Sequence, residues 1–344
     1  MLGDYAQFTL SSQDFSGRNK LSEIAAKIYA YGQADDLRIE PLDLPPPAAG
    51  EVRLRHSAIG VNYVDIYHRT GLYPLKSLPA TLGVEGAGVI EALGPNVHGL
   101  SIGQRVAYAG EVGSYATQRN LAADRVILLP ESVAVDLAAA VMLKGITAHM
   151  LLTHVRKVQP GETVLIHAAA GGLGLVLVQW AKSLGAQVIG TVGSAAKAAL
   201  AKSHGLDHAI LHHEDDFVAA TMALTDGQGV HFAIDGIGGT TLPRTLATVR
   251  PYGMVASIGQ VAGPIGSIAP EWLGPARSIA LSRPGVFCFM RDLVRYREGA
   301  EATLRQLQSG LRIHIDARMP LQEAAMAHRR LESGQSLGAL LLTP

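Results

Sequence analysis

The chain has 344 residues, of which 48% are hydrophobic and 17% are charged, with 38 glycines. This composition is typical of a globular α/β enzyme and excludes a fibrous or disordered chain, while the length predicts two domains or one large one. Basic and acidic residues balance at 29 each without a basic run, so we expect no nucleic-acid partner. The single cysteine, Cys288, excludes an internal disulfide and a cysteine-rich zinc site, and it indicates a reducing, cytoplasmic location.

The N-terminal third of the chain is predicted to be mostly β. Residues 1–25 form a weakly patterned extension without the basic start and apolar run of a secretory signal. Apolar and polar residues then alternate in short segments separated by turn residues, which predicts strands. These predicted strands cover residues 27–31 and 37–41, paired as a hairpin, and then 51–59, 82–93, 103–109 and 115–120. Two helical stretches follow, at 135–144 and 148–155.

The second half of the chain alternates between strands and helices. The predicted strands are 163–167, 187–192, 208–211, 230–235, 252–258 and 278–282, with helices between them. Such alternation predicts a doubly wound parallel sheet, so the fold class is α/β. Helical patterns return at 289–309 and 321–333, and a last strand covers 338–342. Glycines interrupt the longest apolar stretch, 164–181, so we expect no membrane span.

The segment 163–197 carries the most informative motif, because it is typical of strand, glycine turn, helix and strand in succession. Ala169, Gly171 and Gly174 occupy the three places of the G-x-G-x-x-G fingerprint, with alanine in the first. The first place makes the tight turn, the second lets a pyrophosphate approach the backbone, and the third lets helix and strand pack closely. The helix, predicted at 173–184, would turn its free N–H groups toward the phosphates. Gly185 is well placed to end it.

The end of the second strand indicates which dinucleotide binds. NAD-preferring enzymes usually have an acidic residue about 20 positions after the glycines, to accept hydrogen bonds from the ribose. Here Gly193 stands 19 positions after Gly174, and Ser194 and Lys197 follow. No carboxylate lies between 187 and 197. A hydroxyl and an ammonium suit a 2′-phosphate, so we predict NADPH; the alternative is that Lys197 is only a solvated helix residue.

Several segments together resemble one known family. They are GVNYVDIYHRTGLYP (60–74), LGVEGAGVIEALG (82–94), LKGITA (143–148), AAAGGLG (168–174), IDGIGG (234–239) and HRRLESG (328–334). The chain is similar through them to the zinc-free quinone oxidoreductases related to zeta-crystallin, within the medium-chain dehydrogenase/reductase superfamily. The resemblance implies a β-rich, chaperonin-10-like catalytic domain from 26–145 plus 286–344, with an NADPH-binding Rossmann domain, 146–285, inserted in it. It also implies a homodimer in which the last strands of the two nucleotide domains pair.

The resemblance separates the chain from the zinc-dependent alcohol dehydrogenases. A catalytic zinc needs three protein ligands, typically including Cys and His. No cysteine precedes position 288, and Val84 stands before Glu85 where zinc-dependent members carry a histidine. We therefore expect no metal. The group His204, His208, His212 and His213 is not predicted to bind one either, since Gly205 interrupts the helix and no carboxylate or cysteine completes the set.

The resemblance also implies the site residues, which line a cleft between the domains. Asn62, Tyr67 and Tyr73 are the expected catalytic residues, with Tyr73 lining the acceptor pocket; the alternative for both tyrosines is ordinary packing at a domain seam. The expected cofactor-binding residues are Asn62, Asp65, Tyr67, Lys144, Thr147, Ala170, Gly171, Gly172, Leu173, Gly193, Ser194, Lys197, His212, Gly236, Ile237, Ile258, Gly259, Gln260, Arg283 and Gly338.

Two positions depart from the family pattern. Leu211 and His212 stand where relatives often have Asn-Tyr, and the tyrosine there helps to hold the 2′-phosphate. His212 can still meet a phosphate. Gly236 stands where many relatives have serine, which removes a hydroxyl and widens the pocket.

The predicted activity is NADPH-dependent, zinc-independent reduction of a quinone. Two alternatives stay open from the sequence. The first is an NADPH-dependent enone or alkenal reductase. This reaction needs a proton donor to the α-carbon, so replacement of Tyr73 by Phe should slow it more than it slows quinone reduction. The second is an NADPH-binding protein without turnover, because a fold does not guarantee activity.

Overall fold

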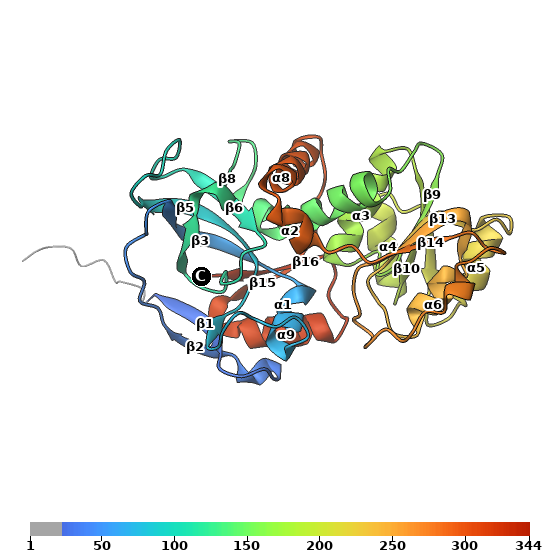
Figure 1. Ribbon diagram of the computed structural model, residues 1–344, viewed down its shortest axis with the longest axis horizontal. Coiled ribbons are helices and arrows are strands. Elements are labelled where there is room, and N and C mark those ends of the chain that lie inside the picture. The colour runs from blue at the N-terminus through green and yellow to red at the C-terminus, as the bar shows by residue number, and fades with distance from the viewer. Residues whose placement is uncertain (1–22) are drawn as a thin grey trace, which may run out of the picture.

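The computed structural model describes residues 23–344. The predicted extension therefore falls almost wholly outside the described residues. The molecule is elongated, with a β-rich part at one end and a parallel sheet flanked by helices at the other (Figure 1). A long central helix and the last strand run between the two parts.

The β-rich part holds two sheets. The larger has the strand order β15-β16-β3-β5-β6-β8, with β7 paired to β3. Its strands are β3 (Glu51–Val61), β5 (Glu85–Leu93), β6 (Arg105–Ala109), β7 (Gln118–Ala122), β8 (Ile127–Leu128), β15 (Ile315–Pro320) and β16 (Ala339–Thr343). The smaller has the order β2-β1-β4, from β1 (Ile24–Ile28), β2 (Arg38–Pro41) and β4 (Ala80–Thr81). Because β16 pairs with β3, the C-terminal segment completes the sheet begun by the N-terminal one.

The parallel sheet has the strand order β11-β10-β9-β12-β13-β14. Its strands are β9 (Thr163–Ile166), β10 (Gln187–Val192), β11 (His208–Leu211), β12 (Val230–Asp235), β13 (Val249–Ser257) and β14 (Ala280–Ser282). All five pairings are parallel. Numbered within this sheet the order is 3-2-1-4-5-6, the doubly wound order of dinucleotide-binding domains. The predicted fold class is confirmed.

Helices cover both faces of this sheet (Figure 1). One face packs on α3 (Gly172–Ser183) and α4 (Ala195–Ser203), and the other on α5 (Phe217–Leu224) and α6 (Thr241–Leu246). The remaining helices are α1 (Tyr63–Thr70), α2 (Val135–His149), α7 (Val286–Arg291), α8 (Leu293–Gln308) and α9 (Ala324–Glu332). The largest buried cluster spans α2, α3 and α8 and joins the two parts of the molecule.

The helix at the centre of the molecule is longer than the sequence predicts. α2 continues through Gly145 and passes directly into a π-helical turn, η3 (Met150–Val155), so the expected break between 144 and 148 is wrong. A Cβ at Gly145 would lie 2.3 Å from Thr303 Oγ1, so this glycine allows α8 to pack closely rather than ending the helix. Val135–Val155 is long and apolar enough to span a membrane, but 78% of its most apolar window is buried inside the protein, as in a core helix.

Other element boundaries also differ from the prediction. The expected strand 82–93 begins only at Glu85, as β5, because the chain turns through Gly83, whose φ is +84°. The expected helix 289–309 breaks at Asp292, whose carboxylate accepts hydrogen bonds from the N–H groups of Val294 and Arg295 and so begins α8. The sequence predicted neither α1 nor β15.

Candidate functional site

Two adjoining cavities lie where the parallel strands end. The Lys144 cavity has a volume of about 320 Å³ and is lined by α1, α2, the glycine turn and the ends of β12 and β13. The Lys197 cavity, of about 710 Å³, is lined by the ends of β10 and β11 and by residues 333–336. The two share the lining residues Tyr63, His167, Ala168, Gly171, Ile237, Val261 and Leu331. They therefore form one elongated groove at the carboxyl edge of the sheet, where doubly wound folds bind ligands.

The glycine turn forms the floor between the two cavities. Ala168 adopts a φ of +51°, a left-handed conformation that is costly for a residue with a side chain and typical of functional turns. A Cβ at Gly174 would lie 2.3 Å from the carbonyl oxygen of Ala168, so the third place of the fingerprint admits no side chain. α3 begins here at Gly172, and the N–H groups of its first turn have no partner within the helix. The turn is thus built to receive an anionic group.

The C-terminal segment closes over this turn. The N–H of Gly338 donates to the carbonyl of Ala170 at 2.9 Å, and Gly338 forms a parallel bridge with Gly171. Gly338 has a φ of +82°, and a Cβ there would lie 2.3 Å from the carbonyl oxygen of His314. Only glycine fits both conditions, so this residue fixes the last strand against the groove.

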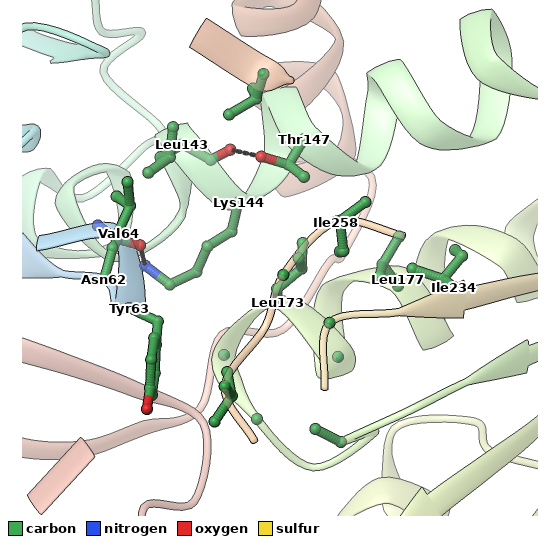
Figure 2. Close-up of a pocket in the computed structure, with 18 of the residues that line it drawn as sticks. Asn62, Tyr63, Val64, Leu143, Lys144, Thr147, Leu173, Leu177, Ile234 and Ile258 are labelled. Atoms are coloured by element: carbon green, nitrogen blue, oxygen red, sulfur yellow. Dashed lines mark hydrogen bonds between the residues drawn. The ribbon is translucent and has the colours of Figure 1, made fainter. Parts of the chain in front are cut away.

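Three buried polar side chains bond to one another beside the Lys144 cavity, and two of them, Lys144 and Asn62, line it. Lys144, from α2, reaches across to Asn62 at the start of α1 (Figure 2), with its Nζ donating to Asn62 Oδ1 at 2.8 Å and to Glu85 Oε2 at 3.1 Å. Asn62 Nδ2 donates to the same Glu85 oxygen at 2.7 Å, and Leu143 N–H donates to Glu85 Oε1 at 2.8 Å. The carboxylate is fully buried and pairs with the cation. The three side chains thus hold one another at the cavity wall.

Two tyrosines, Tyr67 and Tyr73, also line the Lys144 cavity. Tyr67 and Tyr73 have ring centroids 5.1 Å apart, and the Tyr67 hydroxyl accepts the N–H of Gln260 at 2.9 Å. Burial raises the pKa of Tyr67 to about 12, so its hydroxyl stays protonated. Since this oxygen accepts from Gln260, its own hydrogen remains available to a molecule in the cavity.

A series of hydrogen-bonded, buried polar groups connects α1 with Tyr115 and His328. Arg69 Nη1 donates to His328 Nδ1 at 3.1 Å, and His328 Nε2 lies 2.9 Å from the Tyr115 hydroxyl. That hydroxyl donates to Asp65 Oδ2 at 3.0 Å, and the same oxygen accepts the N–H of Asn62 at 2.8 Å. This donor order assigns a neutral His328 with its proton on Nε2. The chain holds Asn62 at the cavity wall.

Burial shifts the pKa values along this chain. It raises the pKa of Asp65 to about 7, although the Asn62 N–H and the Tyr115 hydroxyl both act to lower it. It lowers the pKa of His328 to about 3, with the nearby Arg69 acting in the same direction. Arg69 also forms an ion pair with Glu332 of α9. The polar chain therefore links α1 to α9, whose end borders the groove.

His167 and Asp235 arrange the ends of β9 and β12. The His167 nitrogens lie 2.9 Å from the hydroxyls of Thr191 and Thr245, and burial lowers the pKa of His167 to about 4, which keeps the ring neutral. Asp235 Oδ1 accepts the N–H groups of Ile237, at 2.8 Å, and Gly238. These contacts fix the turn that lines both cavities.

The Lys197 cavity gathers the residues expected to select the cofactor. The Ser194 hydroxyl accepts the N–H of Lys197 and begins α4, while Lys197 Nζ contacts the carbonyl of Gly334 across the cavity. Burial lowers the pKa of Lys197, which Asp316 partly opposes. Burial also lowers the pKa of His212, so His212 is neutral near pH 7. Arg244 adds a further cation at the edge of this cavity.

Most of the predicted site residues line the groove. Those on the Lys144 cavity are Asn62, Tyr67, Tyr73, Lys144, Thr147, Gly171, Gly172, Leu173, Gly236, Ile237, Ile258, Gly259 and Gly338. Those on the Lys197 cavity are Ala170, Gly171, Gly193, Ser194, Lys197, His212 and Ile237. A Cβ at Gly236 would meet only Ile258, at 3.8 Å, so a serine would fit there and its absence widens the cavity.

Three of the predicted cofactor-binding residues, Asp65, Arg283 and Gln260, line neither cavity. Asp65, in the first turn of α1, is fully buried and lines neither cavity, and its carboxylate accepts the N–H of Asn62. Arg283 Nη1 donates to Ser257 Oγ at 2.9 Å, and its Nη2 donates to Gln260 Oε1 at 3.2 Å. Neither Arg283 nor Gln260 is among the lining residues.

The structure adds lining residues that sequence reasoning missed. On the Lys144 cavity these include Tyr63, Val64, Leu143, Val286, Phe287 and Leu331. On the Lys197 cavity they include His213, Arg244, Ser333, Gly334, Gln335 and Ser336. A signal for Ser333 and Gly334 was present in the sequence, because these two residues end the segment HRRLESG (328–334). The apolar residues of the first set carry no signal that separates them from core residues.

Comparisons with known proteins agree with this geometry. Residues 48–131 match the family model described as "Alcohol dehydrogenase GroES-like domain", and residues 172–286 match "Zinc-binding dehydrogenase". These matches, with the β-rich part and the doubly wound sheet, define the class: the chain has the architecture of the medium-chain dehydrogenase/reductases.

Individual relatives narrow the assignment. A Pseudomonas aeruginosa quinone oxidoreductase is 38% identical over 92% of this chain and 98% of its own length. A 2-haloacrylate reductase from a Burkholderia species is 38% identical over 93% of this chain and 99% of its own. The crystal structure of Escherichia coli quinone oxidoreductase complexed with NADPH superposes with a TM-score of 0.90 at 34% identity, covering 93% of this chain and all of that one. The chain belongs to the quinone oxidoreductase family.

Proposed function

We propose that this protein reduces quinones with NADPH, binding the cofactor along the groove and the acceptor in the Lys144 cavity. The observation that carries the proposal is the joining of two sites in one groove. One is a glycine turn at a helix N-terminus beside Ser194 and Lys197, and the other is an apolar cavity with a few polar groups on its wall. A cofactor that extends from one to the other would present its nicotinamide to a flat acceptor.

The residues present fit NADPH. The partner-free N–H groups at the start of α3 and the glycine cradle suit a pyrophosphate. The Ser194 hydroxyl and the Lys197 ammonium suit a 2′-phosphate, and no carboxylate lies between residues 187 and 197 of the sequence. When bound, NADPH supplies the hydride.

The residues of the chain supply position, charge and exclusion of water. Lys144 and Asn62, held by Glu85, give the cavity wall fixed polar groups. The Tyr67 hydroxyl hydrogen can donate to a developing oxyanion on the acceptor. Apolar side chains such as Leu143 and Phe287 close the cavity and exclude water. None of these roles requires a metal, and Val84 stands before Glu85 in place of a ligand, so the proposed reaction is independent of zinc.

The enone-reductase alternative has one specific observation in its favour, the relative named 2-haloacrylate reductase. Quinone reduction is preferred because more of the similar proteins are named quinone oxidoreductases. A steady-state panel distinguishes them: 1,4-benzoquinone, a naphthoquinone and a simple enone, each with NADPH. We expect the quinones to be turned over fastest and Tyr73→Phe to change quinone turnover little. Turnover of the enone alone, with a strong loss in Tyr73→Phe, would move the assignment to the alternative.

Tight NADPH binding without oxidation by any acceptor would support the remaining alternative, an NADPH-binding protein without turnover. Substrate-free controls and a heat-inactivated sample exclude spontaneous reaction between NADPH and the quinone. The comparison with NADH is made in the same panel, since a preference for NADPH is part of the proposal.

We also propose that the protein is a cytoplasmic homodimer. β14 is an outer strand of the six-stranded sheet, so its free edge is available to the same strand of a second copy. Light scattering on the purified protein checks the dimer, and a monomer at micromolar concentration would contradict it. The single, exposed cysteine supports a reducing compartment.

A further inference from the structure

Two histidines and a glutamate converge on the surface away from the groove. His149 ends α2, His154 lies in the π-helical turn η3, and Glu298 lies on the neighbouring α8. None of the three lines either cavity. His149 is largely buried, while His154 and Glu298 are open to solvent, so an ion from solution can reach the group.

The π-helical turn is what brings the two histidines together. In an α-helix, residues five apart point about 140° away from each other, because each residue turns the helix by about 100°. A π-helix instead bonds residue i to i+5, as the N–H of Arg156 does with the carbonyl of Leu151 at 3.1 Å. Here the rings of His149 and His154 have centroids only 5.1 Å apart. Such turns cost hydrogen-bond geometry and occur often at functional sites.

The donor atoms have the spacing of a metal site. His149 Nε2 and His154 Nε2 each lie 3.3 Å from the same oxygen, Glu298 Oε1. All three donor atoms lie within 4.8 Å of one another. Ligands at about 2.0–2.1 Å from a tetrahedral zinc ion are about 3.3 Å apart, so two of the three edges already match. The third edge, between the two histidine nitrogens, is at most 4.8 Å long.

The surroundings also suit a metal ligand. The Thr153 hydroxyl lies 3.5 Å from His149 Nδ1, the nitrogen that does not face Glu298. The same hydroxyl donates a hydrogen bond to the His149 carbonyl oxygen at 2.6 Å. Groups in that position orient a ligating ring. Trp180 and Phe289 pack beside the histidine rings and shield one side of the group from water.

We propose that His149, His154 and Glu298 form a binding site for one divalent zinc-like cation, with water in the remaining position. Two imidazoles and one carboxylate are a common zinc ligand set. The ion would tie the end of the central helix to α8, outside the catalytic groove. Because it binds the folded chain, it would stabilise that state by an amount that rises with the logarithm of its concentration above the dissociation constant.

Equilibrium dialysis of untagged, chelator-treated full-length protein against ZnCl₂ tests the site. We expect one zinc per chain in the wild type, and a dissociation constant raised by about tenfold or more in both His154→Ala and Glu298→Gln. His98→Ala, which removes an exposed histidine outside the group, is the matched control and should bind as the wild type does. The melting temperature should rise with zinc in the wild type and the control only.

Spectroscopy and activity make the test specific. Co²⁺ at the site should give the visible absorption of a tetrahedral ion, and this band should be lost in His154→Ala. Quinone turnover with NADPH should be unchanged in that variant, because His154 does not border the groove. Absence of saturable zinc binding in the wild type, or equal binding by wild type and His154→Ala, would overturn the proposal while leaving the proposed activity untouched.

Discussion

At the scale of single residues, the most consequential group is the buried triangle of Lys144, Glu85 and Asn62. Glu85 holds both of the other side chains and is itself fully buried, so it stabilises the arrangement without reaching the cavity. The sequence pointed to Lys144 and Asn62 through the family resemblance. It did not indicate the role of Glu85, because nothing in the spacing of residues 62, 85 and 144 shows that they meet.

Glu85→Gln should therefore leave the Lys144 ammonium buried without its counter-ion. We expect a loss of about 3–5 kcal/mol in the free energy of unfolding, as for other broken buried pairs, and a large fall in kcat. Urea unfolding and steady-state kinetics measure the two effects. Glu91→Gln is the control, since Glu91 pairs with Arg55 at 2.9 Å on the surface and should cost less than about 1 kcal/mol. Equal effects of the two variants would contradict this account of the triangle.

Lys197→Ala should weaken NADPH more than NADH. Loss of a charge-assisted contact of about 1.5–3 kcal/mol corresponds to a rise of about tenfold to a hundredfold in KM for NADPH, with little change for NADH. Lys202→Ala, an exposed position on the same helix that borders neither cavity, serves as control. A parallel rise for both cofactors would mean that Lys197 acts through its contact with Gly334 and not on a 2′-phosphate.

At the level of helices and strands, local sequence patterns predicted the parallel sheet correctly. They failed for elements whose bounds depend on packing against distant segments. The strand, turn and helix around 163–184 follow from apolar runs and glycine spacing. At Gly145 the close packing against Thr303, which is distant in the sequence, accounts for the glycine inside α2. The π-helical turn was also missed, because no local sequence pattern predicts hydrogen bonds between residues i and i+5. The sequence therefore did not indicate that His149 and His154 lie together.

Gly174→Ala tests whether the glycine turn sets the distance between β9 and α3. The added Cβ would lie 2.3 Å from the Ala168 carbonyl oxygen, which belongs to the backbone and must shift. We expect a destabilisation of about 1–3 kcal/mol, typical of overpacking, together with weaker NADPH binding. Unfolding and fluorescence titration measure these effects. Gly266→Ala is the control, because nothing lies within 4 Å of a Cβ there; unchanged NADPH affinity in Gly174→Ala would refute the role of this glycine.

At the scale of the whole molecule, fold class followed from the alternation of strands and helices, and the family from motifs spread over the chain. The joining of the last strand to the β-rich part could not be read from periodicity, because it pairs residues near 340 with residues near 60. The set of residues that lines the groove also could not be predicted from local patterns, because they come from segments far apart in the sequence. Its apolar wall comes from segments whose sequence alone is that of ordinary core.

The buried histidines predict how stability depends on pH. Burial lowers the pKa values of His56 and His328 to about 3, and those of His68 and His167 to about 4, against 6.5 for an exposed ring. The unfolded chain therefore binds more protons than the folded chain below pH 6.5, and stability falls as the pH is lowered through that range toward 4.

Each such proton contributes about 1.4 kcal/mol per pH unit. Asp65, whose folded pKa is raised from 3.8 to about 7, acts in the opposite direction, but it is one group against four. Urea unfolding between pH 8 and pH 5 should show a stability that is flat above about pH 7 and then declines. His328→Gln should reduce the slope by about one proton. A stability that rises on acidification would contradict the neutral state assigned to these rings.

A single-turnover experiment tests whether NADPH bound in the groove passes its hydride to a quinone. Excess protein is loaded with NADPH and mixed rapidly with 1,4-naphthoquinone, and the absorbance of the reduced nicotinamide is followed. We expect complete oxidation of the bound NADPH in one exponential phase whose rate saturates with quinone, and a much slower reaction when NADH replaces NADPH. Bound NADPH that stays reduced, or that is oxidised no faster than free NADPH, would contradict the proposed function.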